Sequence, residues 1–282
     1  MTSLPLPPDI PTVVSRALAE DLGAADLTAE LIGASSRGRA RVIAREAATL
    51  CGRAWFDETF RQLDVRVKIL WHATDAALIE AGQVVCELEG PARSLVTGER
   101  TALNFLQTLS GTATAARAFV EIVAGTGARI LDTRKTVPGL RLAQKYAVRC
   151  GGGENHRIGL FDAVLIKENH IAAVGSVTEA VRTARRQSPQ VMIEVEVESL
   201  AQFREALGTD ADRIMLDDFS LDDMRSAVRL RDAHHGKRQE LEASGSVNAT
   251  TLRAVAATGV DFISMGALTK HVRAIDFSMR FV

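Results

Sequence analysis

The chain has 282 residues, of which 46% are hydrophobic and 24% are charged, and its formal net charge is −1. This composition is typical of a globular protein with a large core, and the length allows one large domain or two modest ones. A nearly neutral chain with few aromatic residues argues against a nucleic-acid partner, and its apolar runs are too short to cross a bilayer.

The N-terminal arm and the cysteines indicate a reducing compartment. The arm reads MTSLPLPPDIP and lacks the basic and apolar segments of a secretory signal peptide. Cys51, Cys86 and Cys150 are odd in number and far apart in the sequence, so neither a disulfide framework nor a zinc ribbon is indicated. We therefore expect a cytoplasmic protein with no membrane partner.

The first hundred residues mix helical and strand patterns without a regular alternation. Residues 65–71 alternate apolar and polar side chains, as a half-buried strand does. This mixture predicts an α+β domain built on an antiparallel sheet. Helices are expected at 13–22, 54–63 and 95–109, and strands at 40–44, 65–71 and 84–88.

From about Ile130 short apolar strands alternate with amphipathic helices. Such alternation predicts a parallel sheet, and six strands of this kind favour a (β/α) barrel. An open doubly wound sheet is the alternative, but no GxGxxG motif follows the first strand. The strands are expected at 129–132, 163–167, 191–196, 213–217, 241–244 and 262–266, and the helices at 177–186, 200–207, 221–234 and 249–257.

Basic side chains gather in the first two strand–helix units of this region, between Asp132 and His170. Because the carboxyl ends of barrel strands form the active-site face, cations there predict a site for a small, multiply charged anion. The candidate ligands are Arg134, Lys135, His156, Arg157 and Lys167. Solvated surface ion pairs are the competing interpretation, and we favour it for Arg141, Lys145 and Arg149, whose spacing after Pro138 suggests an exposed helical face.

Three glycines, at 151–153, precede the Glu154–Arg157 segment. They form either a phosphate cradle or a helix C-cap followed by a hinge. Their position makes a mobile loop that covers the site a reasonable expectation.

The run EVEVE at 194–198 places three glutamates on one face of a strand. In a barrel the helices cover the outer, valine face, so Glu194, Glu196 and Glu198 should point inward and need cationic or metal partners. Glu196 together with Asp217, at the end of the next strand, could hold Mg²⁺ or accept hydrogen bonds from sugar hydroxyls. A structural ion pair with the basic residues is the alternative.

Small residues end the last two strands, at Ser244-Gly245-Ser246 and Met265-Gly266-Ala267. Late strand ends of a barrel often bind phosphate through backbone N–H groups at a helix N-terminus, which Ser246 or Asn248 could cap. Ordinary turns are the alternative. Cations, acids and small residues together suit an enzyme that joins a carboxylate-bearing molecule to a phosphorylated sugar.

The chain also resembles the quinolinate phosphoribosyltransferase family over essentially its whole length. Several long motifs carry the resemblance, in the order that the family has them. They are GERTALNFLQTLSGTAT at 98–114, LDTRKTVPGLR at 131–141, GGGENHRIGLFD at 151–162, LIKENHI at 165–171, EVEVE at 194–198, IMLDDF at 214–219, ASGSVN at 243–248 and GALTKH at 266–271.

The resemblance implies an activity and a fold. Members couple quinolinate to phosphoribosyl pyrophosphate (PRPP) with Mg²⁺, giving nicotinate mononucleotide, pyrophosphate and CO₂ in NAD biosynthesis. The implied fold is an N-terminal α+β sandwich domain, residues 1–112, followed by an incomplete (β/α) barrel, residues 113–268, in a homodimer. The tail at 269–282 would return to the first domain.

The resemblance also assigns roles to residues. Arg134, His156, Arg157 and Lys167 would surround the dicarboxylate, and Lys135 would lie near it or near the pyrophosphate. Thr133 would be a further substrate-binding residue. Arg100 would reach into the partner subunit's site. Glu196 and Asp217 would engage ribose hydroxyls and Mg²⁺, which with Lys135 and Lys167 makes them the catalytic candidates. The 5′-phosphate would be held by Ser244, Gly245, Ser246, Gly266 and Ala267, whereas the positions of Lys270 and His271 vary among members.

Four other functions are compatible with some of these residues. Lys167 at a strand end could form a Schiff base with a carbonyl substrate. Asp217-Asp218 is similar to the PRPP loop of open-sheet phosphoribosyltransferases, although Phe-Ser-Leu-Asp-Asp follows instead of a Thr- and Gly-rich loop. A protein that binds an anion without reaction, or a relative acting on another aromatic acid, would share the basic cluster.

Overall fold

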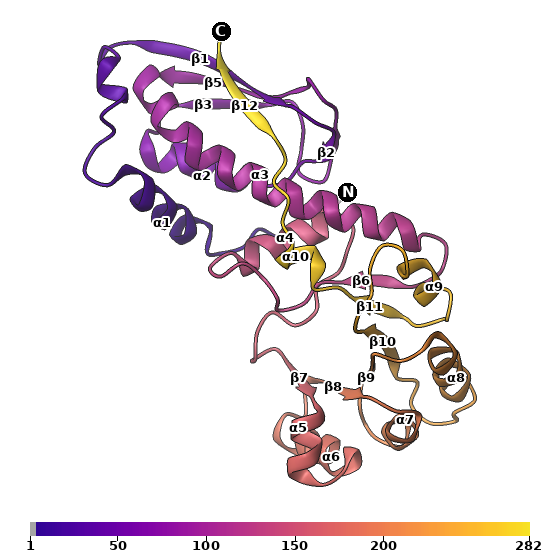
Figure 1. Cartoon of the computed structure of the whole chain (residues 1–282). Coiled ribbons are helices and arrows are strands. Elements are labelled where there is room, and N and C mark those ends of the chain that lie inside the picture. The colour runs from indigo at the N-terminus through magenta and orange to yellow at the C-terminus, as the bar shows by residue number, and fades with distance from the viewer. Residues whose placement is uncertain (1–3) are drawn as a thin grey trace. The chain divides into compact units, whose positions relative to one another are not determined.

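The computed structural model describes residues 4–282, which form two compact units (Figure 1). Unit 1 comprises residues up to Ala118, residues 136–152 and residues 268–282, and unit 2 comprises residues 119–135 and 153–267. The segment 136–152, which the sequence analysis placed in the barrel domain, thus belongs to unit 1. Among residues 4–282 there is no helix that is both long and apolar enough to cross a membrane.

Unit 1 is built on an antiparallel sheet with strand order β12-β1-β5-β3. The strands are β1 (Arg37–Ala44), β3 (Lys68–Trp71), β5 (Val84–Pro91) and β12 (Phe277–Phe281), with β2 (Ala48–Thr49) and β4 (Leu78–Ile79) as a separate pair. The helices are α1 (Ile10–Leu22), α2 (Arg53–Leu63), α3 (Ala92–Val123) and α4 (Arg141–Cys150), with a short 3₁₀ turn at Ala29–Leu31. The C-terminal strand β12 pairs with β1, from Ala40 opposite Phe281 to Ala44 opposite Phe277.

The core of unit 1 is apolar. Alternate residues of β1 point into it, so Val42 is fully buried with Leu88 of β5. Phe56 of α2 and Leu106 of α3 pack against them, which places these helices on one face of the sheet. This layer arrangement confirms the α+β prediction for the first region.

Helix α3 extends well beyond the expected range 95–109, reaching Val123. The expected range stopped short of Gly111, a residue type that weakens a helix interior. The structure gives Gly111 another role, since a Cβ there would lie 2.2 Å from the carbonyl oxygen of Arg273. The glycine therefore allows the C-terminal chain to pass closely over the helix.

The prediction that α4 exposes a basic face was wrong for Lys145. This side chain is only 2% exposed, whereas Arg149 is exposed and Arg141 is half-buried. The reason is that α4 is buried around most of its circumference, and Tyr146 stacks on Trp55 with ring centroids 5.5 Å apart. A helix enclosed on several sides cannot be interpreted from charge spacing alone.

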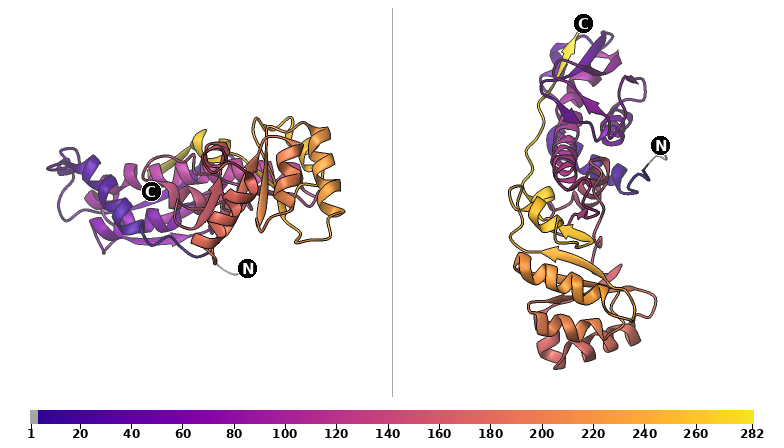
Figure 2. Two further views of the ribbon diagram at one scale, coloured as in Figure 1. Left: turned by 90° about the horizontal axis from the view of Figure 1, so that it is seen from below. Right: turned by 90° about the vertical axis from the view of Figure 1, so that its right-hand side faces the viewer.

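Unit 2 is built on a six-stranded parallel sheet with strand order β6-β11-β10-β9-β8-β7. The strands are β6 (Arg129–Leu131), β7 (Ala163–Ile166), β8 (Met192–Val197), β9 (Arg213–Asp217), β10 (Glu240–Ser244) and β11 (Phe262–Ser264). The connecting helices are α5 (Glu168–Val174), α6 (Val177–Gln187), α7 (Leu200–Leu207), α8 (Leu221–Asp232) and α9 (Leu252–Ala256), and α10 (Ala267–Lys270) follows the last strand. The helices flank the sheet, as Figure 2 shows in orange.

This sheet does not close, because β6 and β7 form its two edges. The position beside β6 is taken by Glu154, which is bridged to Leu131. The prediction of an incomplete barrel is thereby confirmed, and the open doubly wound alternative is not needed.

Candidate active site

The predicted site residues of the barrel all lie in unit 2, after the carboxyl ends of its strands. Because the strands are parallel and in register, these ends share one edge of the sheet. The residues at or just after these strand ends are Thr133–Lys135, Lys167, Glu196, Asp217, Ser244–Ser246 and Gly266–Ala267. Arg100 is an exposed residue of α3 in unit 1.

Arg134 and Arg157 bring two positive charges close to each other. Burial lowers the pKa of Arg157, and the positive charge of Arg134 lowers it further. Like charges held together in a partly buried site favour a ligand that carries compensating negative charge. The pair therefore suits a dicarboxylate, which guanidinium groups can bind in a bidentate manner.

Lys167 and Glu196 form an ion pair, with the lysine Nζ 2.9 Å from Oε2 of the glutamate. The lysine begins α5, where its backbone N–H donates to Nδ1 of His170 at 2.9 Å. Its side chain is 45% exposed, whereas Glu196 is nearly buried. The ion-pair alternative for Glu196 thus describes this structure, and the pair adjoins the strand-end edge at which Asp217 lies.

Glu194 and Glu196 of β8 lie on the inner face of the sheet, as predicted. Ile193, Val195 and Val197 lie on the other face of the strand and are fully buried. Glu194 is completely buried and Glu196 nearly so. Glu198 lies beyond the end of β8 and is exposed, so its inclusion among the inward residues was wrong. Strand β8 ends at Val197, one residue before Glu198, so the sheet does not bury this side chain.

The turn after β10 is held by Asp218, a residue that the sequence analysis did not assign to the site. Its Oδ1 accepts a hydrogen bond from the N–H of Ser246 at 3.1 Å, and its own N–H donates to Ser244 at 3.1 Å. Gly245 has a φ of +126°, and a Cβ there would lie 2.1 Å from Oδ1 of Asp218. Only glycine fits this position.

Lys135 lies across Gly266. A Cβ on Gly266 would be 2.8 Å from Cδ of Lys135 and 3.5 Å from Oγ1 of Thr133. The first and last strands of the unit, β6 and β11, are neighbours, which explains how residues so far apart in sequence meet. The side chain of Lys135 therefore passes over the Gly266-Ala267 turn, which was predicted to bind phosphate.

The glycines at 151–153 act as a helix C-cap. The N–H groups of Gly151 and Gly152 donate to Ala147 and Arg149 at 3.0 Å each. These N–H groups are satisfied by the last carbonyls of α4, as in a capped helix. The phosphate-cradle alternative is therefore not favoured.

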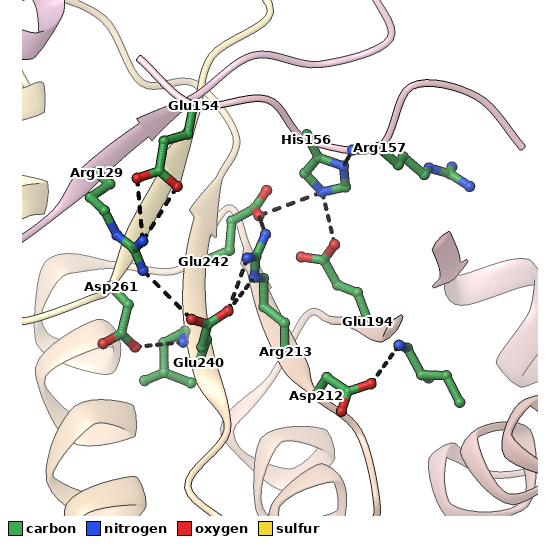
Figure 3. A network of polar contacts seen from close by, with 12 residues as sticks. Arg129, Glu154, His156, Arg157, Glu194, Asp212, Arg213, Glu240, Glu242 and Asp261 are labelled. Carbon is green, nitrogen blue, oxygen red and sulfur yellow. Dashed lines mark hydrogen bonds and ion pairs between the residues drawn. The ribbon is translucent and has the colours of Figure 1, made fainter. Parts of the chain in front are cut away.

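A buried network of charged residues lies behind these strand ends (Figure 3). His156 Nε2 lies 2.8 Å from Glu194 and 3.5 Å from Glu242, and Arg213 bridges Glu242 at 3.2 Å and Glu240 at 2.9 Å. Burial raises the pKa of Glu194 to about 7 and that of Glu242 to about 8. The sequence analysis missed Arg213 and Glu242, although Glu-Leu-Glu at 240–242 repeats the alternation that revealed Glu194 and Glu196.

Glu196 and Asp217 fit a magnesium ion by the chemistry of their donors. They are carboxylates on the neighbouring strands β8 and β9. Mg²⁺ usually takes one or two carboxylates and fills its remaining positions with water and substrate phosphates. A site of this kind depends on a phosphorylated substrate for most of its ligands.

The fold is an incomplete α/β barrel whose strand ends carry cationic, acidic and small residues. Comparison with known proteins defines it further. Residues 26–110 match the family profile described as "Quinolinate phosphoribosyl transferase, N-terminal domain", and residues 112–280 match that of its C-terminal domain. The chain belongs to the quinolinate phosphoribosyl transferase family.

Individual relatives extend over nearly the whole chain. The probable nicotinate-nucleotide pyrophosphorylase [carboxylating] of Bacillus subtilis is 43% identical over 92% of this chain and 89% of its own length. The Mycobacterium leprae nicotinate-nucleotide pyrophosphorylase [carboxylating] is 42% identical over 94% and 95%, respectively. The solved structure of the nicotinate-nucleotide pyrophosphorylase from Francisella tularensis has a TM-score of 0.95 and 46% identity, and it covers 99% of this chain and 98% of its own.

Proposed function

We propose that this protein is an enzyme, a nicotinate-nucleotide diphosphorylase (carboxylating), that transfers the phosphoribosyl group of PRPP to quinolinate. The products are nicotinate mononucleotide, pyrophosphate and CO₂, in de novo NAD biosynthesis. The proposal is carried by the cations Arg134 and Arg157, which lie close enough for the charge of Arg134 to lower the pKa of Arg157 even with Glu194 and Asp162 nearby, in a chain of the quinolinate phosphoribosyl transferase family. The names of the relatives support the choice of quinolinate as that dicarboxylate.

The basic residues orient the acceptor. Arg134 and Arg157 neutralise the two carboxylates, with Thr133 and His156 beside them, so that the ring nitrogen faces C1 of the ribose. Holding both reactants in line accounts for much of the rate. The nitrogen forms a bond to C1 as the bond from C1 to the pyrophosphate oxygen breaks.

The PRPP donor is held at the same edge of the sheet, by residues that follow other strands. Lys135, which crosses Gly266, balances charge on the pyrophosphate, and the turns at Ser244–Ser246 and Gly266-Ala267 hold the 5′-phosphate. Glu196 and Asp217 bind the ribose hydroxyls and stabilise the positive charge that develops on the ribose. Bound Mg²⁺, held by the same two carboxylates, would neutralise the pyrophosphate as it leaves.

Decarboxylation follows from the charge of the product ring. Once the nitrogen is quaternised, the pyridinium accepts the electron pair of the breaking carbon–carboxylate bond, CO₂ leaves and a proton replaces it. Lys135 or Lys167 stabilises this step. A Schiff base at Lys167 is disfavoured, because its side chain is 45% exposed and paired with Glu196, whereas imine-forming lysines are typically desolvated.

We further propose a homodimer in which Arg100 completes the partner subunit's site, in the cytoplasm. Leu160 and Phe161 support an association, since their side chains are 74% and 81% exposed only a few residues after Arg157. Large exposed apolar side chains next to a site often mark an interface. The three cysteines are free thiols, which suits a reducing compartment.

The activity is tested by pyrophosphate release from PRPP and Mg²⁺ with quinolinate, and with nicotinate in parallel. The expected result is pyrophosphate release with quinolinate and not with nicotinate, with one CO₂ formed per pyrophosphate. Release with neither acceptor from folded protein would contradict the proposal and favour a different acid.

The shared site is tested with mixed dimers. Arg100→Ala and Arg134→Ala are each expected to be nearly inactive, because each lacks one cation at every site. Mixing the two variants under subunit exchange should restore up to about a quarter of the wild-type activity, since one site of each heterodimer is intact. No recovery, with exchange verified by labelled subunits, would argue against sharing.

A further inference from the structure

His156 lies between the backbone of Arg157 and two buried carboxylates. Its Nδ1 accepts a hydrogen bond from the Arg157 N–H at 2.8 Å. Its Nε2 lies 2.8 Å from Glu194 and 3.5 Å from Glu242, and both carboxylates are fully buried. Nδ1 is thus in a hydrogen bond, whereas Nε2 is in ion-pair contact with the two carboxylates without the geometry of a hydrogen bond (Figure 3).

These contacts determine the form of the imidazole. A nitrogen that accepts a hydrogen bond carries no proton, so the proton of the neutral ring is on Nε2 and faces Glu194. His156, Glu194 and Glu242 also have the composition of a metal site, with ligand atoms within 4.8 Å of one another. A metal on Nε2 would require a proton on Nδ1, which would then oppose the Arg157 N–H. The geometry therefore favours the Nε2–H form over a metal centre.

The main chain of the same segment is fixed separately by Asp132. Its Oδ1 accepts the N–H of His156 at 2.9 Å, and its Oδ2 accepts the side-chain amide of Asn155 at 2.6 Å. The peptide that carries Arg157 is thus held from both sides, by Asp132 through the backbone and by Glu194 through the imidazole. In Figure 3 the Arg157 side chain extends away from Arg213 and its carboxylate partners.

We propose that Glu194 and Glu242 are positioning residues that act on the substrate through His156 and Arg157. They hold the imidazole in the Nε2–H form, which leaves Nδ1 as an acceptor for the Arg157 N–H and so directs the Arg157 guanidinium to the dicarboxylate. His156 then contributes by placing Arg157, and not by a direct bond to substrate. The effect on substrate rests on the proposed function, while the tautomer does not.

Glu194→Gln and Glu194→Leu test the role in steady-state kinetics. Glutamine keeps an oxygen acceptor for Nε2–H, so the KM for quinolinate should stay within about threefold of wild type. Leucine removes the acceptor, so that KM should rise about tenfold or more while the KM for PRPP is unchanged. Glu240→Leu, in the same network but away from His156, should not raise the quinolinate KM. Equal losses for both substrates, or for Glu194→Gln and Glu194→Leu alike, would overturn the proposal.

A double-mutant cycle separates positioning from direct binding. If Glu194 acts through Arg157, Glu194→Leu should add little to the effect of Arg157→Met on the quinolinate KM. Effects that multiply would overturn the proposal.

The tautomer is measured without activity. Nitrogen-15 NMR of the wild-type imidazoles, with His156 assigned by the spectrum of His156→Gln, should show a proton on Nε2 and none on Nδ1. A proton on Nδ1 would overturn the proposal even in a fully active enzyme. If wild-type protein releases no pyrophosphate but shows the Nε2–H form, the proposed function fails while the local geometry stands.

Discussion

The interiors of the two units differ in kind. In unit 1, Val42, Phe56 and Leu88 belong to a core of apolar side chains. In unit 2, the inner face of the sheet carries charged residues, and Phe262 lies between the guanidinium groups of Arg129 and Arg213, each 4.0 Å from its ring. An apolar core stabilises by removing area from water, whereas buried charges are costly unless fully paired. The charged interior therefore serves the site more than the stability of the fold.

The largest expected effect tests this charged interior. Arg213→Met removes the cation that bridges Glu240 and Glu242 and leaves the buried Glu242 without this partner. It should lower the free energy of unfolding by about 3–5 kcal/mol. Urea unfolding would measure the loss, with Arg225→Met as the control, because its pair with Asp222 is exposed and should contribute less than about 1 kcal/mol. A loss as small as the control's would mean that the network is not a buried charge cluster.

The apolar core should respond through a different mechanism. Leu88→Ala leaves a cavity at a site with 1% exposure and should cost about 2–5 kcal/mol. This loss comes from apolar contacts and should not depend on salt. Val65→Ala, at an exposed position, should change stability by no more than about 0.5 kcal/mol. A strong salt dependence of the Leu88→Ala loss would contradict the view that the core of unit 1 is stabilised by apolar contacts.

Glu242 of unit 2 should contribute to the pH dependence of stability between about pH 5 and 8. The pKa of Glu242 is raised to about 8 by burial, above its value in the unfolded chain, so the folded state binds more protons. Its contribution is full below about pH 4.5 and is lost as the pH rises to about 8, by on the order of a few kcal/mol. Glu242→Gln should flatten this decline in thermal unfolding between pH 5 and 8. An unchanged slope would show that Glu242 does not titrate in this range.

The smallest expected effect concerns Lys135. Gly266→Ala places a methyl group 2.8 Å from its Cδ, and a flexible side chain can move aside. The kcat/KM for PRPP should fall only a few-fold, roughly 1 kcal/mol, with no change in the quinolinate KM. Gly208→Ala, where the nearest atom is at 3.4 Å, serves as the control. A loss of more than about a hundredfold would mean that Lys135 cannot move aside and that the added methyl group displaces the turn that holds the 5′-phosphate.

Much of the fold could be predicted from local patterns. Strand–helix alternation predicted the six strands of unit 2, because each buried strand is a short apolar run of its own. What local patterns could not supply was the assignment of α4 to unit 1, since Lys145 is buried by tertiary packing that charge spacing does not encode.

Site residues could be predicted where a charged side chain lies at or next to the end of a predicted strand, as for Arg134, Lys167 and Glu196. Asp218 and Glu242 were missed because they bind other protein groups and not the predicted ligands. Their partners are 28 and 86 positions away in the sequence, so local patterns do not reveal them.

The most direct test of the account is the kinetics of Arg134→Met at saturating Mg²⁺. If Arg134 and Arg157 bind the dicarboxylate together, kcat/KM for quinolinate should fall by about a hundredfold or more, and the KM for PRPP should change less than about threefold. Equal losses for quinolinate and PRPP in a folded protein would contradict the account, because the pair would then not be specific for the dicarboxylate.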